Sequence, residues 1–60
     1  MTVTWLHNGK VGHAVTGEVT SQSEVYFTAI AKSYESKSER KLIGKSFLIK
    51  KTAAIVHDSK

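Results

Sequence analysis

The chain has 60 residues, no cysteine and a formal net charge of +4. This length allows one domain, and the lack of cysteine excludes disulfide bonds and zinc sites built from thiolates. No apolar run approaches the ~20 residues of a membrane span, and the N-terminal residues do not resemble a secretory signal. We therefore expect a single soluble domain, residues 1–60, located in the cytoplasm.

The basic residues are concentrated in one third of the chain. Residues 1–31 carry a net charge of −1, whereas residues 32–51 carry seven basic residues against Glu35 and Glu39, a net charge of +5. Such a segment attracts polyanions because binding releases their counterions. It also suits a solvated face that keeps a small protein soluble. Both interpretations stay open at this point.

Residues 2–6, Thr-Val-Thr-Trp-Leu, are β-branched, aromatic or apolar, which favours a strand. Asn8-Gly9 follows, and this pair is typical of the two-residue type I′ turn of a β-hairpin. A turn of that length places Leu6 opposite Val11 and Trp5 opposite Gly12. The sequence therefore predicts an N-terminal hairpin with room for the Trp5 ring above Gly12.

Residues 11–20 predict the second strand of this hairpin. Valines recur at alternate positions among polar and small residues, as on a strand with one buried face. Gly17 interrupts the pattern and indicates a bulge or a bend.

Residues 21–43 allow two interpretations. In the first, residues 21–23 form a turn, residues 24–31 form a third strand, and the polar run 33–41 is a long loop. In the second, Ser21 and Glu24 form a capping box for a helix over about residues 22–43, with Phe27, Ile30, Ala31 and Tyr34 on one face and Gly44 after its end. The apolar face of this helix does not continue beyond Tyr34, and the many serines disfavour a helix.

The last third of the sequence again resembles β-structure. Residues 46–49, Ser-Phe-Leu-Ile, predict a central strand covered on both sides. Residues 50–52 suit a turn or edge, residues 52–54 a short helical turn, and residues 54–57 a final strand.

These elements predict an all-β fold of five short strands. The layout resembles a small SH3-like or KOW-type barrel or half-barrel, on the strength of residues 12–31, 46–51, 52–54 and 55–57. That resemblance implies binding of nucleic acid or peptides, although one fold hosts many functions. The helical interpretation of the middle segment gives instead an α+β fold, ββαβ, with the helix packed on one sheet face.

No motif for catalysis or metal binding emerges. His7, His13 and His57 lack the spacing of a metal site, and the serines lack a nucleophile elbow. A chain of this length rarely forms a catalytic pocket unaided. We therefore expect a non-enzymatic protein with no cofactor, no metal and no catalytic residue.

Basic residues interleaved with aromatic ones predict a nucleic-acid-binding face, for DNA or RNA. Phe27 and Phe47 belong to apolar strands and are expected in the core, and Trp5 is expected either in the core or as a cover over the edge at Gly12. The expected binding residues are Tyr26, Lys32, Tyr34, Arg40, Lys41, Lys45, Lys50 and Lys51. A single arginine among nine basic residues favours phosphate contacts and low sequence specificity.

An alternative function is a protein–protein interaction module, an inhibitor of a larger acidic protein or a homodimer. The thin core and the strand edges motivate it, because an unpaired edge can pair with another chain. Neither hypothesis involves a membrane.

Overall fold

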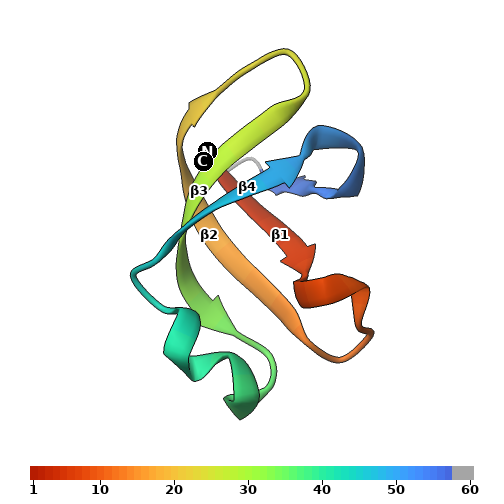
Figure 1. Ribbon diagram of the computed structural model, residues 1–60, viewed down its shortest axis with the longest axis vertical. Coiled ribbons are helices and arrows are strands. Elements are labelled where there is room, and N and C mark those ends of the chain that lie inside the picture. Colours follow the sequence, from red (N-terminus) through yellow and green to blue (C-terminus); the bar gives the residue numbers. More distant parts are fainter. Residues whose placement is uncertain (58–60) are drawn as a thin grey trace.

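The computed structural model describes residues 1–57 of the chain. Within this range the strands are β1 (Thr2–Leu6), β2 (Ala14–Gln22), β3 (Tyr26–Tyr34), β4 (Ser46–Lys50) and β5 (Ile55–His57). The connections contain three short 3-10 helices in the same range: η1 (His7–Gly9), η2 (Lys37–Leu42) and η3 (Lys51–Ala53) (Figure 1). The predicted all-β class with five strands is confirmed.

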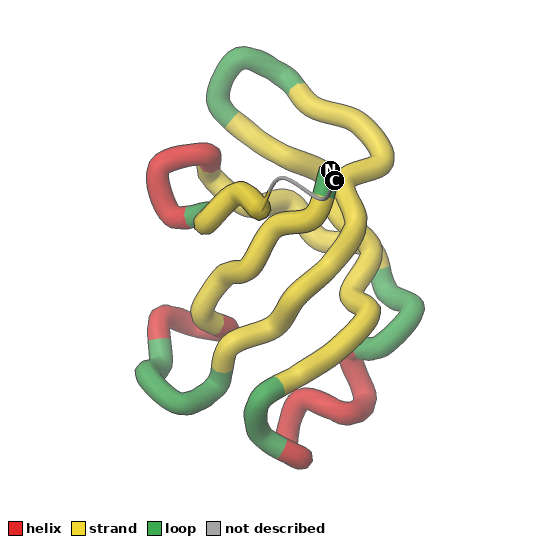
Figure 2. The backbone as a smooth tube through the Cα atoms, turned by 180° about the vertical axis from the view of Figure 1, so that it is seen from behind, coloured by secondary structure: helices red, strands yellow, loops and turns green. Residues whose placement is uncertain are grey.

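The strands form one antiparallel sheet in the order β4-β3-β2-β1-β5. β4 and β5 are its two edges, and the sheet is open between them. The strands curl around a common interior, with the short helices at their ends (Figure 2). This curl brings β1 and β4 together, and as a result the ring centroids of Trp5 and Phe47 lie only 6.0 Å apart.

Apolar side chains fill the interior of the curled sheet. The buried cluster comprises Val3, Trp5, Val15, Phe27, Ala29, Ala31, Leu42 and Ile49. On β3 the buried residues alternate with more exposed ones, as one face of a strand requires. The core position predicted for Phe27 is confirmed, and Trp5 lies in the core, whereas Phe47 is half-buried and packs against the cluster.

The predicted two-residue hairpin between β1 and β2 is wrong. Asn8 and Gly9 do adopt the positive φ values of 54° and 70° that this turn chemistry requires. They lie, however, in a longer loop that also contains Gly12 at a φ of 86°. The loop closes where the backbone N–H of His7 donates to the carbonyl of His13, at 3.1 Å. β2 therefore begins at Ala14 and not at Val11.

The longer loop moves the register of β1 against β2 by three residues. Leu6 pairs with Ala14 and Trp5 with Val15, whereas the sequence placed them opposite Val11 and Gly12. An odd shift exchanges the faces of the strand. Val11 is consequently 89% exposed, and the interior receives Val3, Trp5 and Val15, which gives the physical reason for the observed register.

Gly17 provides the space for the indole that the sequence attributed to Gly12. A β-carbon at position 17 would lie 3.0 Å from Cη2 of Trp5 and 2.5 Å from the carbonyl oxygen of Ile30. The pairing of β2 with β3 also shifts between Thr16 and Gly17, so the irregularity predicted at this glycine is confirmed.

The helix predicted as the alternative for about residues 22–43 is wrong, and with it the ββαβ fold. Burial at alternate positions of β3 satisfies strand periodicity, which a helix would not. Ser21 and Gln22 belong to β2, and the Ser23 hydroxyl accepts the N–H of Tyr26 at 3.1 Å within the β2–β3 turn. The polar run after β3 is not one long loop either, because it contains η2.

The strand predicted at residues 46–49 matches β4, and the predicted short helical turn and final strand match η3 and β5. The expectation that β4 is covered on both sides is wrong. β4 is an edge strand that pairs with β3 alone, and Leu48 is 70% exposed. None of the helices among residues 1–57 has the length and apolar character required to cross a membrane.

Candidate nucleic-acid interface

The predicted binding residues lie on β3, η2, β4 and η3 and, for Lys45, just before β4, in two groups at opposite ends of the β3–β4 pair. The first group is formed by Lys32, Tyr34, Arg40, Lys41 and Lys45. The backbone N–H of Ala31 donates to the carbonyl of Lys45 at 3.0 Å, which places Lys45 directly beside this end of β3. All four cations of the first group are exposed, and the Tyr34 side chain is 37% exposed.

The second group consists of Tyr26, Lys50 and Lys51. Tyr26 and Lys50 are directly opposite each other across the β3–β4 pair, and Tyr26 is 37% exposed. Lys51 is half-buried, and its Nζ lies 5.1 Å from the centroid of the Phe27 ring. Along β4, Lys45 and Lys50 are separated by about 16 Å at ~3.3 Å per residue.

The cations of both groups are free of carboxylate partners among residues 1–57. The salt bridge found in this range joins His13 to Glu39, with Nδ1 and Oε1 at 2.9 Å. Glu35, the other acid of the basic segment, accepts the backbone N–H of Ala14 at 3.2 Å. Both carboxylates are thus directed toward the start of β2, and the local net charge of +5 is not neutralised by ion pairing.

Among residues 1–57, Glu39 is the polar or charged residue that is buried, with 7% of its side chain exposed. The Ser38 hydroxyl donates to it at 2.7 Å and lowers the pKa of Glu39 most strongly. Burial raises this pKa in opposition, while the hydrogen bond to His13 and the electrostatic attraction of His13 and His7 lower it. The net effect is a pKa below the ordinary value of 4.5, so Glu39 is ionised at neutral pH.

Sequence reasoning missed this buried pair, because it considered Glu39 part of the polar run 33–41. The signal was present at Ser36 and Glu39, which have the spacing of a capping box. Ser36 does cap η2, since its hydroxyl accepts the N–H of Ser38. Glu39, however, bonds to His13 and does not reach back to the cap, and no local pattern predicts that partner.

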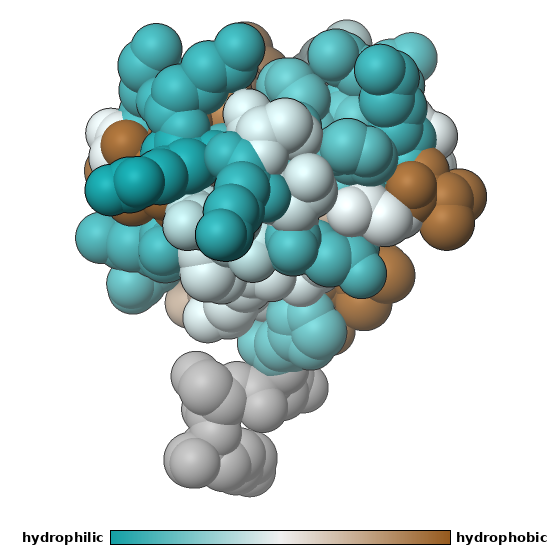
Figure 3. All heavy atoms as spheres, turned by 90° about the horizontal axis from the view of Figure 1, so that it is seen from below, coloured by the Kyte–Doolittle hydropathy of each residue, from teal (hydrophilic) through white to brown (hydrophobic). Residues whose placement is uncertain are grey.

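The end of the molecule that carries η2 is covered mainly by polar side chains. Figure 3, which views the molecule from below, shows hydrophilic side chains gathered across this end and apolar ones at its margins. A polyanion approaching the first basic group would therefore meet a hydrated surface with few apolar interruptions.

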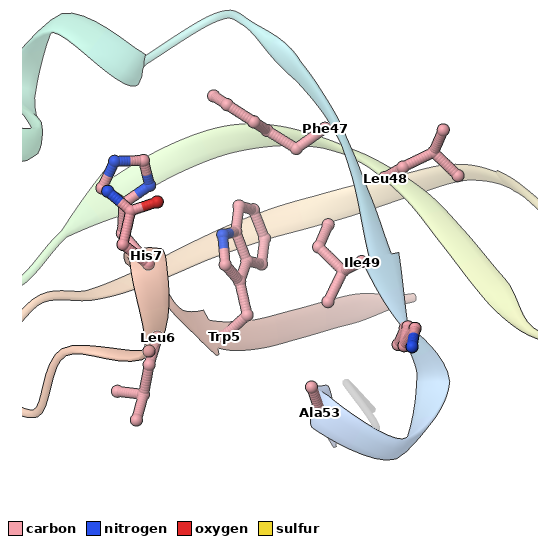
Figure 4. A pocket seen from close by; sticks show the side chains of 10 residues that line it. Trp5, Leu6, His7, Phe47, Leu48, Ile49 and Ala53 are labelled. Atoms are coloured by element: carbon pink, nitrogen blue, oxygen red, sulfur yellow. The ribbon is translucent and has the colours of Figure 1, made fainter.

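An apolar groove of about 720 Å³ lies between β1 and β4. We call it the β1–β4 groove; Trp5, Phe47 and Ile49 form its floor, and Leu6, Leu48 and Lys50 lie at its rim. In Figure 4, Trp5 and Ile49 point toward each other from β1 and β4, Phe47 extends over Trp5, and Leu6 and Leu48 point outward. The sequence did not predict this groove, since it depends on the curl of the sheet.

The side chains of His13 and His57 have different hydrogen-bond partners. His13 bonds to Glu39, and Nε2 of His57 lies 2.8 Å from the Thr4 hydroxyl. Among residues 1–57, no three or more side chains of the metal-ligating types are grouped so that they could hold an ion.

Comparisons with protein-family models, with curated proteins and with solved structures found no match to this chain.

Proposed function

We propose that this chain is a small, non-enzymatic binding protein that contacts DNA or RNA through its basic segment, with low sequence specificity. The supporting observation is that the cations of both basic groups have no carboxylate partner within residues 1–57, while Glu35 and Glu39 are engaged elsewhere. Unpaired surface lysines bind phosphates without first breaking an internal ion pair. Affinity then comes mainly from counterion release.

The two basic groups suit a strand that runs along the β3–β4 pair. The ~16 Å between Lys45 and Lys50 corresponds to roughly five nucleotides of one strand of a duplex, at an axial rise of ~3.4 Å per nucleotide. Tyr26 and Tyr34 would offer partly exposed rings near either end, and ring stacking on bases tolerates any sequence. Arg40 alone can supply the two-pronged hydrogen bonding that guanine readout uses, so base discrimination is expected to be weak.

We further infer an SH3-like or KOW-type half-barrel and a cytoplasmic location. The features that support the half-barrel are the strand order β4-β3-β2-β1-β5, the curl of the sheet and the single 3-10 turn η3 between β4 and β5. The fold by itself does not select nucleic acid over other ligands. The proposal therefore rests on the charges.

Fluorescence anisotropy with labelled single-stranded DNA, duplex DNA and RNA at about 50 mM salt tests the proposal. For four phosphate contacts to a single strand, affinity should fall roughly 50-fold between about 50 and 200 mM salt. Charge reversal of Lys45, Lys50 and Lys51 together should abolish binding. Lys10→Glu changes one charge in the exposed β1–β2 loop and should reduce affinity far less than Lys45→Glu. The absence of binding to all three nucleic acids at low salt would rule the function out.

A further inference from the structure

The outer edge of β4 presents unpaired backbone groups beside the β1–β4 groove. The carbonyl of Lys45 and the N–H of Lys51 both bond to the β3 side, to Ala31 and Val25. Because backbone direction alternates along a strand, Ser46, Leu48 and Lys50 direct their N–H and C=O groups away from β3. Within residues 1–57 no strand pairs with β4 on that side, so the outward N–H groups of these three residues have no strand partner there.

The opposite wall of the groove is formed by Trp5 and Leu6 of β1, with Ala53 of η3 at one end. β5 pairs with Thr2, Val3 and Thr4, so within residues 1–57 no strand pairs with Trp5 or Leu6 on this side of β1. We therefore expect that an extended segment can lie along β4 without displacing β5. Its side chains would alternate between the groove floor of Trp5, Phe47 and Ile49 and the opposite face, where Leu48 is exposed.

The charges around β4 indicate which kind of segment can pair with this strand. Lys45 precedes the strand, Lys50 ends it and Lys51 follows it, with no carboxylate paired to any of them within residues 1–57. A second copy of this chain pairing antiparallel about Leu48 would bring Lys45 opposite Lys51, a like-charge contact that disfavours self-pairing. A segment with carboxylates near its ends and apolar residues at alternate positions complements both the charges and the groove.

We propose that the β4 edge and the β1–β4 groove bind an extended, acidic segment of a partner protein, which adds a strand to the sheet beside β4. The main-chain groups of Ser46, Leu48 and Lys50 would hold its backbone. Trp5 and Phe47 would receive one apolar side chain, and Leu48 another. This binding does not depend on the nucleic-acid proposal, because it uses edge hydrogen bonds and an apolar groove in addition to lysines.

Proline at position 48 provides a specific test of the edge. The N–H of Leu48 faces outward, so Leu48→Pro removes an edge donor while leaving the hydrogen bonds of β4 to β3 in place. Leu48→Ala is the matched control, because it also removes the leucine side chain but keeps the donor. Neither variant changes the number of lysines, so nucleic-acid affinity should be the same in both.

The experiment selects random peptides of about ten residues, displayed on phage, against the immobilised wild-type chain. Enriched peptides should alternate apolar with other residues and carry net negative charge. They should bind Leu48→Pro at least tenfold more weakly than Leu48→Ala. Titration of a selected peptide into wild-type protein should shift the amide resonances of Ser46, Leu48 and Lys50 and the Trp5 indole, which tests the site even if the proline variant unfolds.

Three outcomes would overturn the proposal. They are a library that yields no binder, selected peptides that are basic, and shifts that leave β4 and Trp5 unchanged. A dimer formed through β4 in the absence of peptide, seen by light scattering and by the same amide resonances, would instead identify a second copy as the occupant.

Discussion

The Nδ1 atom of His13 lies 2.9 Å from Oε1 of Glu39, and this contact joins the end of the β1–β2 loop to η2. Ser38 completes the arrangement, since its hydroxyl donates to the other carboxylate oxygen at 2.7 Å. The pair withdraws one of the two acids of the basic segment from the surface. The same ion pair therefore stabilises η2 and increases the positive charge of the surface proposed to bind nucleic acid.

Removal of the Glu39 carboxylate should destabilise the fold. Glu39→Ala leaves His13 and Ser38 without their buried acceptor, so the free energy of unfolding in urea should fall. Glu39→Gln keeps an oxygen for Ser38 and should be less harmful. Glu24→Gln, in the exposed β2–β3 turn, is the matched control and should leave stability unchanged. Equal stability of Glu39→Ala and Glu24→Gln would show that the buried pair is unimportant.

Acid should weaken the fold through Glu39. Its pKa is lower in the folded chain than the ordinary value of 4.5, so the folded state binds the proton less readily than the unfolded state. The contribution of Glu39 is thus fully present above about pH 4.5 and is lost as the pH falls through the lower folded value. Urea unfolding between about pH 7 and 3 should show this loss. Glu39→Gln should reduce the acid-dependent loss, and an unchanged pH profile would contradict the assignment.

Gly17→Ala should be more damaging than Gly12→Ala. The added carbon at position 17 meets the Ile30 carbonyl and the Trp5 ring, and overpacking of this kind costs about 1–3 kcal/mol. At position 12 the space is open, so the cost is the positive φ alone, about 1–2 kcal/mol. Urea titrations followed by Trp5 fluorescence measure both changes. A Gly17→Ala variant as stable as wild type would mean that the observed register is incorrect.

Lys50 and Lys51 should differ when each is changed to glutamine. Lys51 lies over the Phe27 ring, so Lys51→Gln should cost about 0.5–1 kcal/mol of stability, whereas Lys50→Gln should cost almost none. Each substitution removes one positive charge. The slope of log affinity against log salt concentration should therefore decrease by the equivalent of up to one phosphate contact. Thermal unfolding and anisotropy separate the two effects. Identical stability of the two variants would show that the contact of Lys51 with the Phe27 ring does not stabilise the fold.

The strands of this fold could be predicted from local pattern, whereas their pairing could not. The β-branched and aromatic residues of 24–31 favour a strand, and β3 is found over most of this segment. Asn8-Gly9 has the backbone conformation its sequence indicates, but Gly12 extends the loop and moves the register. The edge position of β4 is a property of the sheet order, and an apolar run such as residues 46–49 is equally typical of central and edge strands.

In the candidate site, too, some features follow from neighbouring residues and others depend on contacts between distant residues. The concentration of lysines in residues 32–51 is visible in the sequence, because it is a property of neighbouring residues. The pairing of His13 with Glu39 joins residues 26 positions apart and depends on how η2 packs. The β1–β4 groove depends on the approach of Trp5 to Phe47, which only the curl of the sheet produces.

The most direct test of the basic interface is an NMR titration of the labelled protein with a short single-stranded oligonucleotide at about 50 mM salt. We expect the amide and lysine side-chain resonances of β3, η2 and β4 to shift together, with Lys32, Lys45 and Lys50 among the largest changes. We expect small changes for β5 and for the residues around Lys10. Shifts spread evenly over the molecule, or confined to β5 and the β1–β2 loop, would contradict a nucleic-acid interface formed by the basic segment.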